Sequence, residues 1–200
     1  MGRFSFLEKI IFVIYSCGIL LGVAEFSLAI GAEGGQAVPA DQSACSATLL
    51  KNKDYFPSLI KAIDESKSEI IMSFFLFKAG VHKESYPDVI LVHLAQAVKR
   101  GVKITVILEN TGGDDRKLDA ENQQTKQLLE EKGVNVYFDS PRQTTHTKLI
   151  VIDQRLVLLG SHNLTQASLK YNNEISILLD RPDLAKDARN YMLKIIKEAK

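Results

Sequence analysis

Apolar and polar positions recur with two different periods along most of the chain. From residue 47 onward, segments with apolar residues three or four positions apart, the spacing of one helix face, alternate with short continuous apolar runs of strand length. The helical pattern occurs at 55–66, 88–100 and 118–132, briefly after Asn163, and from 183 or 184 onward. The strand pattern occurs at 47–50, 69–77, 103–108, 134–138, 148–153, 156–159 and 174–179. This alternation predicts an α/β fold in which a mixed β-sheet is sandwiched by helices.

The periodicity also predicts which side chains the helices bury and where the chain turns. The helix from Asp88, with Pro87 before it, is expected to bury Leu91, Leu94, Ala95 and Val98. The last helix is expected to turn inward Ala188, Tyr191, Met192, Ile195 and Ile196. The strands 148–153 and 156–159 are expected to form a hairpin around Gln154 and Arg155.

The N-terminal residues follow a different pattern. Arg3 and Lys9 precede an apolar run at 10–24, which spans roughly 22 Å as a helix and is short of the ~30 Å hydrocarbon core. A basic start, a short apolar run and small residues after it predict a signal peptide at 1–32, with an uncleaved membrane anchor as the alternative. Either one predicts an exported domain, periplasmic or secreted, or a domain anchored at a membrane. A linker at 33–46 and a single domain at 47–200 follow.

Composition and charge narrow the picture only slightly. Apolar residues make up 46% of the chain, which suffices for a core, and the formal net charge is +1. Bulk charge therefore does not indicate a nucleic-acid binder, and any phosphate-binding field has to be local. Cys17 lies in the apolar segment, so Cys45 has no partner for a disulfide within the mature chain. Cys45 is either a free thiol or a bridge between two subunits. The cysteines show no metal-binding spacing.

The polar residues that carry chemistry lie around the apolar strand at 149–152. They stand at fixed spacings: His146, Lys148, Asp153, Gly160, Ser161 and Asn163. A histidine and a lysine two positions apart on one strand point to the same face. An imidazole is thereby placed beside a fixed positive charge, as attack on a phosphodiester requires.

This spacing resembles the HKD signature of the phospholipase D superfamily, H-x-K-x4-D-x6-G-S-x-N, and every specified position is filled. Thr165 and Glu174 extend the likeness beyond the signature, and the whole stretch from about residue 47 to 200 is covered. The resemblance implies the mixed-sheet α/β fold of that superfamily, and a phosphodiesterase that uses no metal and no other cofactor.

The chain carries the signature once, and this has a consequence for assembly. Displacement at phosphorus needs a nucleophile on one side and a proton donor on the other, and one imidazole cannot occupy both sides. The family brings two signatures together, so the resemblance implies a homodimer with one composite site. His146 of one subunit would form a phosphohistidine, and His146 of the other would protonate the leaving oxygen and then activate water.

The resemblance assigns the remaining site residues as well. Lys148 and Asn163 would hold the non-bridging oxygens, Ser161 would support them, and Glu174 would fix the ring of a His146. Asp153 is expected to make structural hydrogen bonds, and Gly160 belongs to the structural part of the motif.

The substrate stays open between two classes. The chain resembles small exported one-motif members, which include non-specific endonucleases, so nucleic acid is the first expectation. A phospholipase D that hydrolyses phosphatidylcholine-type lipids is the alternative, and a non-catalytic binding module is disfavoured by the complete residue set. The loop at 78–87, with Tyr86, is the expected place of substrate contact, and His162 is expected either to touch substrate or to face solvent.

Overall fold

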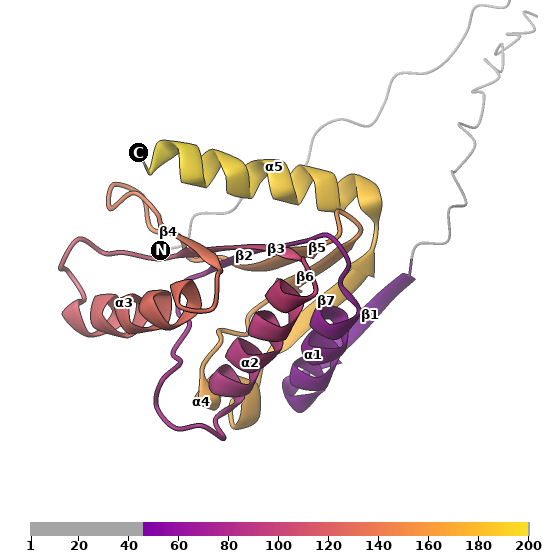
Figure 1. The fold of residues 1–200 in the computed structure, drawn as a ribbon, viewed down its shortest axis with the longest axis horizontal. Coiled ribbons are helices and arrows are strands. Elements are labelled where there is room, and N and C mark those ends of the chain that lie inside the picture. The colour runs from indigo at the N-terminus through magenta and orange to yellow at the C-terminus, as the bar shows by residue number, and fades with distance from the viewer. Residues whose placement is uncertain (1–45, 200) are drawn as a thin grey trace, which may run out of the picture. The chain divides into compact units, whose positions relative to one another are not determined.

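A mixed sheet forms the centre of the part of the chain that the structure, a computed structural model, describes, residues 46–199 (Figure 1). Its seven strands lie in the order β1-β7-β6-β5-β2-β3-β4. Their bounds are β1 Ser46–Lys51, β2 Glu69–Phe74, β3 Lys103–Leu108, β4 Asn135–Phe138, β5 Lys148–Ile152, β6 Leu156–Gly160 and β7 Ile175–Asp180. β2, β3 and β4 run parallel, and the other neighbours are antiparallel. The predicted α/β fold with a mixed sheet is confirmed. The predicted targeting segment and Cys45 lie outside the described residues, and Ser46, assigned to the linker, begins β1.

Helices cover both faces of this sheet (Figure 1). Their bounds are η1 Asn52–Asp54, α1 Tyr55–Glu65, α2 Tyr86–Lys99, α3 Arg116–Glu130, α4 Gln166–Lys170 and α5 Pro182–Glu198. α1, α2, α3 and α4 lie on one side, and α5 lies alone on the other. Among the described residues, no helix combines the length and the hydropathy needed to cross a bilayer.

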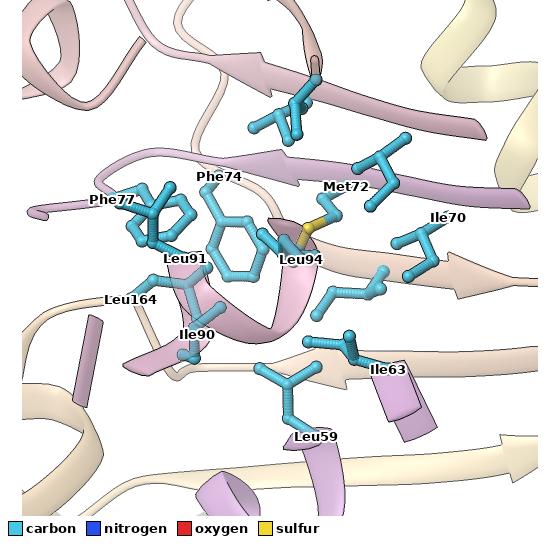
Figure 2. Packing of buried hydrophobic residues seen from close by; sticks show 14 of the residues in the cluster. Leu59, Ile63, Ile70, Met72, Phe74, Phe77, Ile90, Leu91, Leu94 and Leu164 are labelled. Carbon is cyan, nitrogen blue, oxygen red and sulfur yellow. The ribbon is translucent and has the colours of Figure 1, made fainter. Parts of the chain in front are cut away.

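Two apolar clusters hold the layers together, one on each face. The larger cluster packs α1 and α2 on the sheet, with Leu59, Met72 and Leu94 fully buried within it (Figure 2). The smaller one joins Val151 and Val157 of the sheet to Met192 of α5. Successive strand residues point to opposite faces, so the apolar run of β5 supplies both clusters and has to be apolar throughout.

Strand ends gather the predicted site residues at one end of the sheet. Phe74, the last residue of β2, pairs with Lys148, the first of β5. Gly160, the last residue of β6, pairs with Ser176 near the start of β7. Residues that follow β2 and β6, or precede β5 and β7, therefore meet at a single edge.

The hairpin between β5 and β6 turns one residue earlier than the sequence predicts. The Arg155 amide donates to the Ile152 carbonyl at 3.0 Å, and the two residues between them, Asp153 and Gln154, both have a φ of 52°. Two consecutive left-handed residues match the right-handed twist of the flanking strands. The turn is therefore centred on Asp153 and Gln154, and the prediction of Gln154 and Arg155 is wrong.

Two helices differ from the predicted ones in detail. α2 begins at Tyr86 because the Ser85 side chain caps it by accepting the Asp88 amide. Its buried set contains Ile90 and Ala97, while the predicted Ala95 and Val98 are only half-buried. In α5 Met192 is buried as predicted, but Tyr191 is half exposed. Tyr191 lies at the margin of the stripe that α5 turns toward the sheet.

Candidate active site

His146 and Lys148 lie side by side at the start of β5. His146 precedes the strand and is exposed, and Lys148 is its first residue. The Lys148 Nζ atom lies 3.3 Å from the His146 Nδ1 atom and donates to the His146 carbonyl oxygen at 2.9 Å. The structure thus places the imidazole and the ammonium group together, as the spacing predicts.

The ring of Phe75, which the sequence did not single out, lies beneath both His146 and Lys148. Its ring centroid lies 4.7 Å from that of His146, and the Lys148 Nζ atom lies 5.2 Å above the same ring. The Phe75 amide donates to the Thr147 carbonyl at 3.1 Å, which extends the pairing of β2 and β5 by one step. An aromatic face beside a cation stabilises the positive charge.

Burial lowers the pKa of Lys148, and the negative charge of Glu174 opposes this shift only in part. A partly desolvated ammonium group is less stabilised by water than an exposed one. An anion that reaches the site therefore gains a stronger interaction than it would with a surface lysine.

Glu174 provides the anionic part of the site and is held by several donors. Its carboxylate accepts hydrogen bonds from the Ser161 hydroxyl, from the Ser168 hydroxyl at 2.8 Å and from the Asn172 amide at 3.3 Å. Burial by itself would raise the pKa of Glu174, but these hydrogen bonds outweigh it and lower the pKa. In the described part of one chain, no hydrogen bond joins Glu174 to His146.

Asn163 reaches the same group of residues through Ser168. The Asn163 backbone N–H donates to the Ser168 hydroxyl at 2.9 Å, and that hydroxyl donates onward to Glu174. The Asn163 Oδ1 atom is buried and has no hydrogen-bond partner within residues 46–199. A buried acceptor without a donor costs about 1–3 kcal/mol, so this oxygen would be stabilised by any donor that reaches it.

Gly160 is needed because β7 passes too close for a side chain. A Cβ atom at Gly160 would overlap the Ser176 Oγ atom, the Ser176 Cα atom and the Ile175 carbonyl oxygen. This approach lets the Ser161 amide donate to the Ile175 carbonyl at 2.9 Å, while the Ile175 amide donates to the Ser161 hydroxyl at 3.0 Å. Gly160 therefore sets the position of Ser161.

Asp153 lies at the opposite end of β5 and has a structural environment. Its carboxylate accepts from the Lys67 amide at 2.9 Å, from the Ser68 amide and hydroxyl at 2.8 and 2.7 Å, and from the Glu69 amide at 3.0 Å. The carboxylate thereby fixes the segment that leads from α1 into β2. These are the structural hydrogen bonds that the sequence predicts for Asp153.

His162 neither touches the site nor faces solvent, so both expectations for it are wrong. It is fully buried, and its ring stacks on Tyr55 with 4.3 Å between the ring centroids. Its Nε2 atom donates to the Asn52 carbonyl at 2.9 Å, which leaves Nδ1 to accept from the Ser176 hydroxyl at 2.7 Å. Burial lowers the pKa of His162, in keeping with a neutral ring between these partners.

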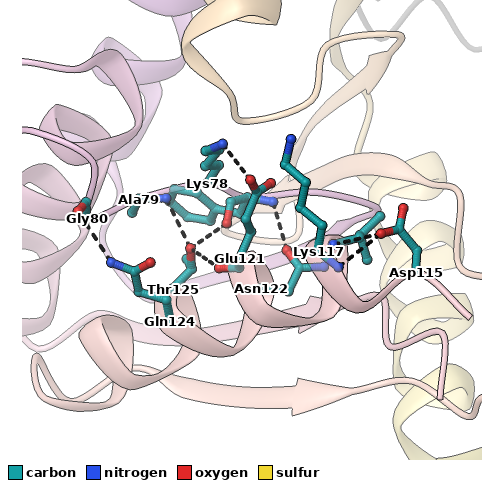
Figure 3. Close-up of polar contacts among 11 residues, drawn as sticks. Lys78, Ala79, Gly80, Asp115, Lys117, Glu121, Asn122, Gln124 and Thr125 are labelled. Atoms are coloured by element: carbon teal, nitrogen blue, oxygen red, sulfur yellow. Dashed lines mark hydrogen bonds and ion pairs between the residues drawn. The ribbon is translucent and has the colours of Figure 1, made fainter. Parts of the chain in front are cut away.

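The loop at 78–87 is fastened to its neighbours. The Tyr86 ring stacks on Phe56, with 4.0 Å between the ring centroids, and Thr125 of α3 accepts from the Ala79 amide at 3.0 Å (Figure 3). Tyr86 packs against the larger apolar cluster. Tyr86 is therefore half-buried against the core, and substrate contact by this loop stays a prediction.

The residues at this edge form a set suited to phosphoryl chemistry. An exposed imidazole lies beside a cation, and a carboxylate, a hydroxyl and an amide lie at the ends of the adjoining strands. An imidazole can attack phosphorus or transfer a proton, and the lysine can stabilise the developing negative charge. Within residues 46–199, no three His, Cys, Asp or Glu side chains are grouped so that they could hold a metal ion.

The fold and the site are suited to phosphoryl chemistry, and comparison with known proteins shows the family. The family model described as "Cardiolipin synthase, PLD-like domain" matches residues 59–196. The chain therefore belongs to the phospholipase D superfamily.

The curated relatives that are similar to this chain are much longer proteins. Cardiolipin synthase A of Buchnera aphidicola subsp. Baizongia pistaciae is 30% identical over 129 residues, which cover 60% of this chain and 26% of that protein. Cardiolipin synthase B of Escherichia coli K12 is 30% identical over 128 residues, which cover 58% of this chain and 29% of that protein. The chain thus spans between a quarter and a third of the length of these curated relatives.

Two solved structures match in length as well as in fold. The phospholipase D family member Nuc from Salmonella typhimurium has a TM-score of 0.66 and 24% identity, and the match covers 78% of this chain and 97% of Nuc. NucT from Helicobacter pylori has a TM-score of 0.64 and 18% identity, with 77% and 97% covered. These structures confirm the phospholipase D fold.

Proposed function

We propose that this protein is an exported, non-specific endonuclease that hydrolyses phosphodiester bonds without a metal ion. The observation that carries the proposal is the agreement in length. The matched region covers 97% of both Nuc and NucT but only 26% and 29% of the two cardiolipin synthases. A nuclease of this size needs only the one domain, since the exposed His146 lies at an edge of the sheet where a polymer can reach it.

The proposed reaction proceeds in two displacements. The His146 imidazole of one subunit attacks phosphorus and forms a nitrogen–phosphorus bond, while the bond from phosphorus to the leaving oxygen breaks. The partner's His146 donates a proton to that oxygen, then takes a proton from water as the water attacks phosphorus and releases His146. Lys148 and Asn163 stabilise the charge on the non-bridging oxygens in both steps.

Glu174 fits this scheme as the group that orients an imidazole across the dimer. Its donors Ser161, Ser168 and Asn172 keep it ionised, and an ionised carboxylate accepts a ring N–H and stabilises the imidazolium form. In one subunit His146 lies beside Lys148 instead. We therefore assign Glu174 to the partner's His146.

A row of apolar side chains that α5 leaves partly exposed supports a second copy of the chain as the partner. Leu149, Leu159, Ile177 and Leu49 are direct neighbours across β5, β6, β7 and β1. Leu149 packs in the cluster under α5, so the row lies on the face that α5 covers. Leu159 and Leu49 are nevertheless 42% and 55% exposed, and Ile175 beside them is 53% exposed. Leu159 directly precedes Gly160, and Ile175 directly follows Glu174, so two such rows packed about a two-fold axis would form an apolar interface next to both sets of site residues.

The dimer is tested by placing a charge in this row. Leu159→Asp should convert a dimeric wild type to a monomer in sedimentation equilibrium and reduce cleavage at least about 100-fold, because one imidazole is lost from each site. Val92→Asp is the matched control, since Val92 is 51% exposed on α2 in the opposite layer. A wild type that is fully active as a monomer would contradict the composite site.

Lipid hydrolysis is the second candidate, and a specific observation favours it. The matching family model is named for cardiolipin synthase, and the curated relatives described above carry that name. The same two displacements would act on a phosphatidylcholine-type lipid and give phosphatidate and the free alcohol.

Cleavage by the purified protein in excess EDTA separates the two candidates. Single-stranded DNA, duplex DNA, RNA, phosphatidylcholine vesicles and cardiolipin vesicles are offered in parallel, with His146→Ala as the control. Cleavage of nucleic acid that the variant lacks supports the nuclease. Release of a lipid headgroup with nucleic acid left intact would replace it by the phospholipase. An absolute need for a divalent cation would overturn both.

Export is tested separately by N-terminal sequencing. A protein recovered from the periplasm or the medium with an N-terminus near residue 32 supports a cleaved signal peptide. An intact N-terminus in the membrane fraction supports the anchor.

A further inference from the structure

Two buried acids that the proposed mechanism does not use lie next to the segment that carries His146. Glu109 directly follows β3, and Asp139 directly follows β4. β3 and β4 are parallel neighbours whose last residues, Leu108 and Phe138, pair with one another. The acids therefore leave the sheet side by side, and they are only 2% and 4% exposed.

Both carboxyl groups converge on one backbone amide. The Thr145 N–H donates to the Glu109 Oε2 atom and, at 3.0 Å, to the Asp139 Oδ2 atom. The other Asp139 oxygen, Oδ1, accepts from the Asn110 amide at 2.9 Å. Thr145 is itself buried and directly precedes His146. The backbone N–H of the residue before the histidine is therefore bound by two side chains from two different strand ends.

α3 holds the other side of the same assembly. Asn122 is fully buried and donates to the Glu109 carbonyl and to the Phe75 carbonyl, both at 2.9 Å. It also accepts from the Phe77 amide at 3.1 Å. One side chain thus links the backbone that carries Glu109 to the backbone that carries the aromatic floor of His146.

We propose that Glu109 and Asp139 are a positioning pair for His146, which fix the Thr145 amide and thereby the place of the imidazole over Phe75. The proposal rests on the proposed function, because it assigns His146 to the reaction. Neither acid is a catalytic residue, since both act only through the backbone.

A proton on Glu109 relieves the repulsion between the two buried carboxyl groups. Burial raises the pKa of Glu109 to about 7, and its hydrogen bond to Asp139 adds to the shift, while the Thr145 amide opposes it. Two ionised carboxylates so close together in a buried site repel one another. The protonated Glu109 therefore donates to Asp139 below pH 7, and this bond is lost above it.

The charged groups around the pair do not reverse this expectation. Asp119 on α3 raises the pKa of Glu109 further. Asp139 and Thr145 line a pocket together with Arg142, Lys194 and Glu198. A rise in pH through 7 therefore adds a negative charge to the buried pair. The positive charges of Arg142 and Lys194 lie only on the side of the pocket.

The stability of the wild type gives a readout that needs no substrate. Because the pKa of Glu109 in the folded state lies above its ordinary value of 4.5, the folded state keeps a proton that the unfolded chain has released. The urea midpoint should therefore fall as the pH rises from 4.5 through 7. In Glu109→Gln this part of the fall should be absent, because glutamine offers the same donor and acceptor without titrating.

Activity then separates positioning from mere stability. Glu109→Gln should keep cleavage within about threefold at pH 6 and lose less activity than wild type between pH 7 and 8.5, while Glu109→Ala should lower kcat at least about tenfold with KM little changed. Glu84→Gln, at an exposed acid in the loop before α2, controls for the change of charge.

The outcomes distinguish this proposal from the proposed function. A wild type that cleaves neither nucleic acid nor lipid overturns the proposed function, and the positioning role falls with it. A wild type that cleaves, with Glu109→Ala as fast as wild type and Glu109→Gln sharing its pH profile, overturns the positioning pair alone. Rescue of rate and pH profile by glutamine but not by alanine supports it.

Discussion

The two ends of the β5–β6 hairpin differ in how fully their polar groups are bonded. At the turn, the Asp153 carboxylate is bound by the amides of Lys67, Ser68 and Glu69 and by the Ser68 hydroxyl. At the other end, the buried Asn163 Oδ1 atom has no partner in the described chain, and His146 is exposed.

This difference separates the residues of the motif that stabilise the fold from those that we expect to bind substrate. A carboxylate that is fully hydrogen-bonded contributes to the fold and has no bonding capacity left for a substrate. A partly desolvated lysine costs stability, and a bound phosphate offers it a partner, whereas the unbonded Asn163 oxygen is an acceptor and needs a donor. Changes at the turn should therefore alter unfolding and leave the rate of the folded enzyme intact, and changes at the site should do the reverse.

The largest effect is expected at His146. His146→Ala should lower cleavage by at least about 10³-fold, because it removes the proposed nucleophile and the proposed proton donor together. The thermal midpoint should stay close to that of wild type, since the ring is exposed and the backbone is held through Thr145. Steady-state rates and a thermal melt of the same preparation measure both quantities.

His93→Ala is the matched control for this change. His93 pairs with Asp64 at 2.7 Å between α2 and α1 and has no contact with the site residues. Its removal should leave the rate unaltered. Activity of His146→Ala within about tenfold of wild type would contradict the assignment.

Asn163→Ala is expected to sharpen the comparison by separating rate from stability. The rate should fall by about 100-fold, because a donor to the transition state is lost. The free energy of unfolding should change by less than about 1 kcal/mol, because the loss of packing is offset by removal of an unbonded buried oxygen. Urea unfolding monitored by circular dichroism checks the second quantity, and a loss above about 3 kcal/mol would show that Asn163 serves the fold.

Asp153→Ala should show the opposite pattern. Its loss leaves the amides of Lys67, Ser68 and Glu69 without their acceptor and puts alanine at a φ of 52°, so the free energy of unfolding should fall by about 2–3 kcal/mol. The rate per folded molecule at 20 °C should be unchanged. A rate loss that persists under conditions where the variant is folded would mean that the turn is coupled to the chemistry.

The smallest effect is a difference in acid sensitivity at this turn. Burial alone would raise the pKa of Asp153, but the hydrogen bonds from Glu69, Ser68 and Lys67 outweigh it and lower the pKa below its ordinary value of 3.8. The resulting stability is complete above pH 4 and is lost as the pH falls through the folded pKa. Asp153→Asn should therefore lose less stability than wild type between pH 4 and 2. Glu174 has the same sign of shift and remains, so part of the loss should persist.

The sequence predicted the sheet between helices and the proximity of His146 and Lys148, because both depend on the local pattern of apolar and polar residues. The apolar run of 149–152 needs burial on two faces, and the spacing from His146 to Asn163 brings strand ends together once β5 and β6 pair. Both predictions for His162 were wrong because its ring has a partner that is distant in sequence, Tyr55. Tyr86 likewise stacks on the distant Phe56, a contact that the sequence did not predict.

The positioning pair, Glu109 and Asp139, has a signal in the sequence that was not used. Glu109 and Asp139 each stand directly after an apolar run, and the runs belong to neighbouring parallel strands. Acids at such positions meet at one edge of the sheet, so their proximity is predictable from pattern. Their convergence on the Thr145 amide is not, since it depends on the path of the loop between β4 and β5.

The most direct test of the account is the stereochemical course at phosphorus. Cleavage of a phosphodiester with one chiral phosphorothioate linkage in ¹⁸O-labelled water reports whether phosphorus is attacked once or twice. Attack by His146 followed by attack of water inverts the configuration twice, so the account predicts net retention. Net inversion would mean that water attacks directly, and it would contradict a covalent intermediate on His146.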